Sequence, residues 1–441
     1  MVGKLNSCSR RQGRSPLLQM LGLLCALAVP PPVWAGTPAP YGEYFVRLGQ
    51  SWPDAGAITP GPEPLPGPES DDVARFERQL DQLQEHGGPY ADTLAEPLSD
   101  LARFYRRSGD VAQAQKAYLR ALHVVRINEG LYSERQVPIL KELFEIYRMT
   151  GDMATLDARY DYFFRLYGSG QPPYTPVRVG AALEYLRWQR EALRLGLDER
   201  DTERLLALYS LNEQMLQAAA ADPTVEFSSY RALALSQLRN LYLLQDRYEP
   251  RVDTIGTAPS VGMPTAWDEQ DAGQHRLEAL QRNALGRGRV LLEGLIARTP
   301  PGQVEELADA WLELADWNQW NDRQQEALED YARVVTLLQE GGRGELLQQW
   351  LGQPLELPAN GAFWQPRPMP EGAAPVIVQA SYDVSATGRA SNIETSATDS
   401  ENQSAAGRVR RNLAQTRFRP RILDGEPAAE LHLTRDYQVV N

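Results

Sequence analysis

The chain has 441 residues, a formal net charge of −13 at pH 7 and only two cysteines. This length is sufficient for two or three domains. The acidic balance excludes nucleic acid as a general partner, because a negatively charged surface repels the phosphate backbone.

Residues 1–35 have the pattern of a secretory signal. Four cations precede the apolar run LLQMLGLLCALAV, and PPPVWAG then supplies small residues for cleavage after Ala35. The run is shorter than the ~20 residues that cross a bilayer, so we expect cleavage, with an uncleaved anchor as the alternative. Cleavage would change the formal charge to −17 and remove Cys8 and Cys25. The exported chain would then have neither disulfides nor thiolate metal ligands.

Residues 36–69 are rich in proline and glycine and are predicted to be a linker. From 70 to 351 the spacing of apolar residues predicts helices. The segment PLSDLARFYRRSGDVAQAQKAYLRAL resembles the tetratricopeptide repeat, a hairpin of two helices. In this resemblance small residues allow close helix approach, tyrosines fill the seam and a glycine permits the turn. The matching residues are Leu98, Leu101, Ala102, Tyr105, Gly109, Ala114, Tyr118 and Ala121.

A shift of 42 residues reproduces this pattern. The second unit contains Leu140, Leu143, Tyr147 and Gly151. Phe144 and Leu156 replace its small residues, so we expect looser packing or another helix angle. A third unit contains Trp311, Leu314, Ala315, Ala327 and Tyr331, with Asp322 at the glycine position. The intervening helices are interpreted as degenerate repeats, with an irregular helical domain as the alternative.

Residues 352–371 form a second proline-rich linker, and 372–441 form a small module. PVIVQASYDVS alternates apolar and polar residues with the period of a strand, TG makes a turn, and RASNIETS returns as a second strand. A helix then places Ala406, Val409 and Leu413 inward. FRPRI, an Asp424-Gly425 turn and a last strand follow, with Leu431, Leu433, Tyr437 and Val439 alternating.

This strand–strand–helix–strand order, with Phe-Arg-Pro after the helix and Asp-Gly before the last strand, resembles the carboxy-terminal domain of TonB-like proteins. The resemblance implies that the module adds an extended segment of a protein partner to an exposed sheet edge. The candidate partner-binding residues on strand 428–439 are Leu431, Leu433, Thr434, Tyr437 and Gln438. A TonB-type energy transducer has an uncleaved membrane helix with a histidine, and no histidine occurs in the apolar run here.

Two other features are candidates for binding. Six arginines lie within fourteen residues and either meet an anionic partner or form a solvated face: Arg408, Arg410, Arg411, Arg417, Arg419 and Arg421. Of the three neighbouring tryptophans, Trp311 occupies a packing position. Trp317 and Trp320 lie outside the repeat consensus and either line a groove or cap the array.

The four histidines are scattered without metal-ligand spacing, and no phosphate loop or nucleophile elbow occurs. We therefore expect no enzyme activity, cofactor or metal.

The sequence predicts a mostly α protein, in which a tetratricopeptide-like hairpin array precedes a small α+β (ββαβ) TonB-like domain. We expect an exported periplasmic adaptor that binds protein partners, with an outer-membrane or other envelope protein as a candidate, and that has no stable membrane span. The alternatives are a component of a TonB-type energy-coupling or transport apparatus, or an envelope enzyme with a site in 176–300.

Overall fold

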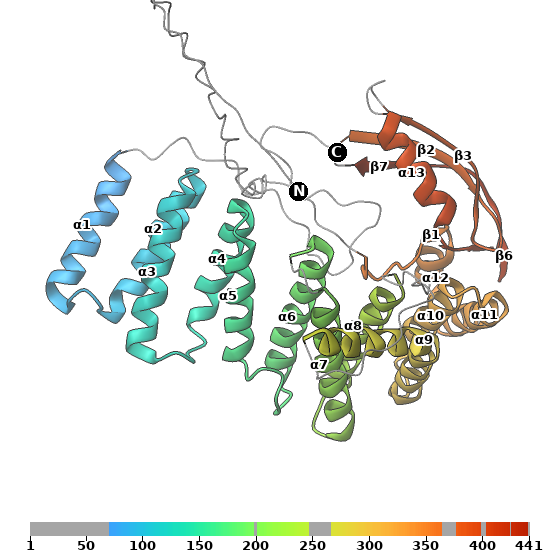
Figure 1. Cartoon of the computed structure of the whole chain (residues 1–441), viewed down its shortest axis with the longest axis horizontal. Helices are drawn as coiled ribbons and strands as arrows, with labels where there is room; N and C mark the ends of the chain where they lie inside the picture. The colour runs from blue at the N-terminus through green and yellow to red at the C-terminus, as the bar shows by residue number, and fades with distance from the viewer. Residues whose placement is uncertain are drawn as a thin grey trace, which may run out of the picture. The chain divides into compact units, whose positions relative to one another are not determined.

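The computed structural model describes residues 70–197, 201–246, 266–363, 376–397, 403–423 and 425–439. The predicted signal, the first linker, Asp424 and residues 364–371 of the second linker lie outside these ranges. Twelve α-helices fall in the described part before residue 352, and each packs against the next one along the chain (Figure 1). Their bounds are α1 Ser70–Gly87, α2 Ala95–Arg107, α3 Val111–Glu129, α4 Gln136–Thr150, α5 Met153–Leu166, α6 Pro176–Leu195, α7 Asp201–Ala221, α8 Phe227–Asp246, α9 Ala266–Arg298, α10 Val304–Trp320, α11 Gln324–Glu340 and α12 Gly344–Leu351.

The predicted hairpins α2–α3, α4–α5 and α10–α11 turn at equivalent positions. Gly109 and Gly151 have φ values of 82° and 71°, the left-handed region that glycine tolerates best. The aspartate after each glycine caps the next helix, since Asp110 accepts a hydrogen bond from the Gln113 amide at 3.0 Å. In the third hairpin Asp322 takes the left-handed conformation itself, with φ 58°. Aspartate is among the few residues that adopt this conformation.

Most of the residues assigned to repeat packing are buried. Figure 1 shows α2 beside α3 and α4 beside α5. The assigned side chains of these helices are buried in the first core cluster. Two aromatic residues differ from the expectation. Tyr105 is only half-buried because it lies in the last turn of α2, where its ring contacts Phe104. Trp311 is also half-buried, beneath the guanidinium of Arg333. The buried set is Leu98, Leu101, Ala102, Ala114, Tyr118, Ala121, Leu140, Leu143, Tyr147, Leu314, Ala315, Ala327 and Tyr331.

Helices α4 and α5 approach each other less closely than α2 and α3, as expected from the larger Phe144 and Leu156, but aromatic side chains fill the space between them. Phe144 stacks on Tyr160 with ring centroids 4.1 Å apart, and Tyr160 stacks on Trp188 of α6 at 4.8 Å. Leu156 is fully buried. An aromatic column therefore occupies the volume that small residues would have closed by bringing the helices together.

Trp317 is an internal residue. It is completely buried and donates its indole N–H to the Leu285 carbonyl at 3.1 Å. A Cβ atom at Gly288 of α9 would lie 2.3 Å from the Trp317 ring, so this glycine permits the close approach of α9 and α10. Of the two alternatives for Trp317, its complete burial excludes the groove. Trp320 is half-buried and packs near Phe363, with ring centroids 5.3 Å apart.

The C-terminal region follows the predicted strand–strand–helix–strand order. Strands β2 (Val376–Val384), β3 (Ala390–Ala397) and β7 (Glu430–Val439) form an antiparallel sheet in the order β3-β2-β7, and α13 (Gln403–Gln415) packs on β3 and β2. Ala406, Val409 and Leu413 of α13 are buried in the module's core. A short hairpin joins β5 (Arg421–Leu423) to β6 (Glu426–Ala428).

One part of the predicted linker is structured. β1 (Leu355–Glu356) pairs with β4 (Phe418–Arg419), so residues from before the module enter its fold. The described C-terminal region is therefore built from two separated stretches of the chain.

Candidate partner-binding site

The outer edge of β7 is the candidate site for a captured strand. β7 pairs with β2 on one side, and no described strand lies on its other side. The register between the two strands is regular from Leu433 to Val439. Within the described residues, the backbone groups on the outer side of this stretch have no partner strand and can accept a strand of another chain. β3 is the other edge, but its register shifts near Asn392, so its longest regular stretch, Glu394 to Ala397, is shorter.

Two β-bulges are joined by one carboxylate. His432 on β7 and Asn392 on β3 both have positive φ, at 56° and 50°, where the registers shift. Asp383 of β2 lies between them. Its Oδ1 atom accepts from the His432 amide at 2.8 Å, and its Oδ2 atom accepts from the Asn392 side chain at 2.7 Å. These hydrogen bonds lower the pKa of Asp383, and the bond from the His432 amide makes the largest contribution.

The bulge on β7 changes which residues face the core. Leu433 is half-buried and Tyr437 is buried, but Leu431 is 64 % exposed. The expected alternation from Leu431 to Val439 was therefore wrong at its first residue, because one extra residue in the bulge reverses the side-chain direction. Thr434 and Gln438 are exposed, on the face of β7 that points away from the module's core.

The inner face of β7 is fixed by polar contacts. The Tyr437 hydroxyl lies 2.9 Å from that of Tyr382 and donates to Glu356 of β1 at 2.5 Å. Arg435 donates to the Pro354 carbonyl at 2.6 Å. Burial raises the pKa of the Glu356 carboxyl, while the bonds from Tyr437 and Arg435 oppose that rise. The inner face of β7 is thus fixed by contacts with residues 354–356, and one of its edges is paired with β2. The outer edge is therefore held in an extended conformation that an added strand can pair with.

A buried ion pair connects the module to the last hairpin. Arg419 of β4 donates through Nε to Asp316 of α10 at 2.9 Å, and both side chains are almost fully buried. The Tyr331 hydroxyl also donates to Asp316, at 2.8 Å, and Arg419 donates to the Trp350 carbonyl. Although burial opposes the charged form, the carboxylate of Asp316 raises the pKa of Arg419.

Two further contacts complete this junction. Gln319 of α10 donates to the carbonyls of Thr387 and Phe418, at 2.9 and 3.1 Å. Asp322, the left-handed turn residue, accepts from Arg389 at 2.7 Å and Arg417 at 2.9 Å. The hydrogen bond from Arg417 is the main reason that the pKa of Asp322 is lowered. The module is therefore joined to the array by polar contacts of two kinds. The ion pair of Asp316 and Arg419 is buried, and the ion pairs of Asp322 are exposed.

The predicted arginine face divides into two groups. Arg417, Arg419 and Arg421 bind Asp322, Asp316 and Glu430 within the chain, so they are structural. Arg408, Arg410 and Arg411 are exposed on α13. The six arginines therefore do not form one surface, because three of them have carboxylate partners within the chain. Two of these partners, Asp316 and Asp322, come from distant parts of the chain that spacing does not reveal.

The histidines lie on α1, α3, α9 and β7. No group of three or more histidine, cysteine or carboxylate side chains in the described residues is placed to hold a metal ion. None of the described helices is both long enough and apolar enough to span a membrane.

No family model matches the chain. A curated protein of Pseudomonas putida named "Putative glutamate--cysteine ligase 2" is 38% identical over 91 residues, which cover 21% of this chain and 22% of that protein. This chain therefore matches only about a fifth of that relative's length. A solved "Circular tandem repeat protein with novel repeat topology and enhanced subunit contact surfaces" is 16% identical, with a TM-score of 0.28 over 64% of this chain and 68% of its own. Neither similarity assigns an activity to this chain.

Proposed function

We propose that this protein is an exported periplasmic adaptor that captures an extended segment of a protein partner along the outer edge of β7. The observation that carries this proposal is the regular edge from Leu433 to Val439, which pairs with no other strand that the structure describes. β2 pairs with its inner edge, and Glu356 of β1 accepts a hydrogen bond from Tyr437. An added strand gains main-chain hydrogen bonds without rearrangement of the sheet, and the exposed side chains contribute specificity. The tetratricopeptide-like array supplies a second binding surface, and the TonB-like resemblance of the module supports the same mode of capture.

Export is the part of this proposal that depends on residues 1–35. We expect the mature protein to start at Gly36. Intact-mass measurement of the exported protein tests this start, and retention of residues 1–35 would favour the anchored, energy-coupled alternative.

Amide hydrogen exchange of the full mature chain, alone and with a partner isolated from envelope extract, tests strand capture. We expect alternate amides between Leu433 and Val439 to exchange rapidly in the free chain and to become protected in the complex, because their N–H groups then donate to the captured strand. Protection confined to α13, with loss of binding when Arg408, Arg410 and Arg411 are changed to glutamate, would contradict the proposal and identify the arginine face as the site.

Substitutions at the edge provide a matched control. Proline removes an amide donor, so Thr434→Pro or Gln438→Pro should abolish capture when the changed amide faces outward. Thr434→Ser keeps the backbone donor and should leave the affinity nearly unchanged. Circular dichroism of each variant shows whether the chain is still folded, so that a failure to bind can be assigned to the missing amide donor.

A further inference from the structure

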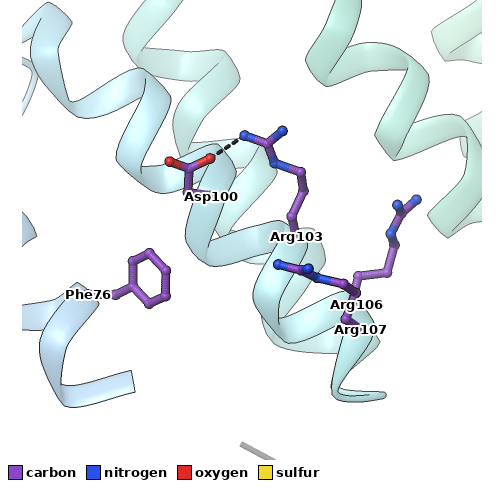
Figure 2. Close-up of a pocket in the computed structure, with 5 residues that line it drawn as sticks. All are labelled: Phe76, Asp100, Arg103, Arg106 and Arg107. Atoms are coloured by element: carbon purple, nitrogen blue, oxygen red, sulfur yellow. Dashed lines mark hydrogen bonds and ion pairs between the residues drawn. The ribbon is translucent and has the colours of Figure 1, made fainter. Parts of the chain in front are cut away.

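A pocket with three arginines lies where α1 meets α2, far along the chain from the β7 edge. Figure 2 shows its lining residues, which are Phe76 of α1 and Asp100, Arg103, Arg106 and Arg107 of α2. Its volume is about 440 Å³, within the range of sites that hold small ligands or a few residues of a peptide. Neither the repeat packing nor the module uses this space.

The three guanidinium groups are held to different degrees. Arg103 pairs with Asp100 one turn earlier, and Arg106 pairs with Glu142 of α4 at 2.6 Å. Arg107 is exposed and forms no ion pair with any residue that the structure describes. Two arginines are therefore oriented by carboxylates, and a third is available to an incoming anion.

The opposite wall of the pocket is aromatic. Phe76 is partly buried against the first core cluster, with its ring centroid 5.7 Å from that of Phe104. A ligand between this ring and the arginines would meet an apolar surface on one side and planar donors on the other. Guanidinium groups bind carboxylates through paired hydrogen bonds, and an aromatic ring favours an apolar neighbour.

We propose that this pocket binds an acidic segment of a protein partner, with a carboxylate on Arg103 and Arg107 and an adjacent apolar side chain on Phe76. A free inorganic anion would use the arginines but leave the Phe76 wall unoccupied. The site is independent of strand capture by β7, so either proposal can fail without the other.

The test uses the full mature chain and the peptide acetyl-Gly-Phe-Glu-Glu-Gly-amide, with binding followed by isothermal calorimetry at low salt. We expect Arg107→Ala to weaken binding by about tenfold, since a charge-assisted hydrogen bond is lost. Arg282→Ala removes an exposed arginine from α9 and should leave the affinity unchanged.

The variant Asp100→Asn distinguishes a binding role of the pocket residues from a purely structural one. It removes a competing carboxylate and releases Arg103, so the peptide should bind several-fold more tightly at an unchanged melting temperature. An unchanged or weaker affinity of Asp100→Asn would overturn the proposal. Equal binding of acetyl-Gly-Phe-Gln-Gln-Gly-amide would also overturn it, because the carboxylates would then be irrelevant.

Inorganic phosphate distinguishes the source of the anion. We expect phosphate to compete only at concentrations far above the peptide dissociation constant, because it lacks contact with Phe76. Competition at equal concentration would show a general anion site and would overturn the assignment to a peptide.

Discussion

The α4–α5 hairpin and the junction between α10 and β4 are both buried, but apolar side chains fill most of the hairpin, whereas polar contacts dominate the junction. In the hairpin, Leu140, Leu143 and Tyr147 pack without exposed surface, and Phe144 stacks on Tyr160. In the junction, the central contact is the ion pair of Asp316 and Arg419. Apolar packing tolerates small changes of angle, whereas a buried ion pair requires correct geometry and a full set of hydrogen bonds.

This difference explains how the two regions are joined. Repeats pack mainly on their neighbours, and one buried ion pair, between Arg148 of α4 and Glu191 of α6, adds to the apolar surface of the α4–α5 hairpin. The module must instead dock in one orientation on the end of the array. Asp316, Gln319 and Asp322 place three polar contacts along the end of α10 and its turn, and each has a defined partner in the module. We infer that the polar contacts specify the docking orientation.

Removing one charge of the junction is expected to have the largest effect. Asp316→Ala leaves Arg419 buried without its carboxylate, which should lower the free energy of unfolding by about 3–5 kcal/mol. Urea denaturation measures this change. Arg343→Ala breaks the exposed pair with Glu305 and should cost less than about 1 kcal/mol. A cost of Asp316→Ala as small as that of the control would show that the junction does not depend on the ion pair.

Two tyrosines at equivalent positions test the apolar region. Tyr147 is 1% exposed, so Tyr147→Ala should destabilise the chain by about 3–5 kcal/mol, the range for large aromatic deletions. Tyr105 is half-buried, so Tyr105→Ala should cost clearly less. Thermal or urea unfolding compares them directly. Equal costs would contradict the different burial of the two rings.

Substitution of two glycines compares a turn with open space around it, at Gly109, with a turn that contacts β4, at Gly388. Gly109 has open space around it, so Gly109→Ala adds only the cost of a left-handed alanine, about 1–2 kcal/mol. At Gly388 a Cβ atom would lie 2.1 Å from the Phe418 carbonyl oxygen, so Gly388→Ala must also displace β4 or the turn. Its greater loss of stability should appear in urea denaturation. Similar losses for both variants would show that the docked turn moves at little cost.

The effect of Glu313 is expected to be visible as a pH dependence of stability. Burial, with Asp309 and Asp316 nearby, raises its pKa from 4.5 to about 8, while Arg239 and a hydrogen bond from Asn360 oppose the rise. The folded chain therefore binds an extra proton between these values. Its contribution to stability is complete below about pH 4.5 and is lost as the pH rises through about 8.

Glu313→Gln keeps the shape of the side chain but cannot ionise. We expect the loss of stability between pH 5 and pH 9 to be smaller in this variant than in the parent chain. Urea unfolding at both pH values measures it. An identical pH dependence of the two chains would show that Glu313 does not titrate in this range.

The periodicity of the sequence was sufficient to predict the local elements. The helices of the array, the Gly-Asp turns and the strand–strand–helix–strand order follow from spacing and turn residues, because these depend on neighbours within a few positions. The same spacing assigned Leu98, Leu140 and Tyr331 to packing positions, and the structure places all three in the core. The signal and its consequences for export remain predictions from residues 1–35.

The tertiary structure decided which polar residues act together. Asp316 and Arg419 are 103 positions apart, and no local pattern marks them as a pair. Asp383 likewise joins two bulges, and the bulge on β7 turns Leu431 outward against its alternation. Such contacts depend on how distant elements meet. One extra residue in a bulge reverses which side chains of a strand face the core, and a buried charge is stable only beside a partner of opposite charge. Local periodicity therefore sets the elements of this chain, and long-range geometry sets the contacts between them.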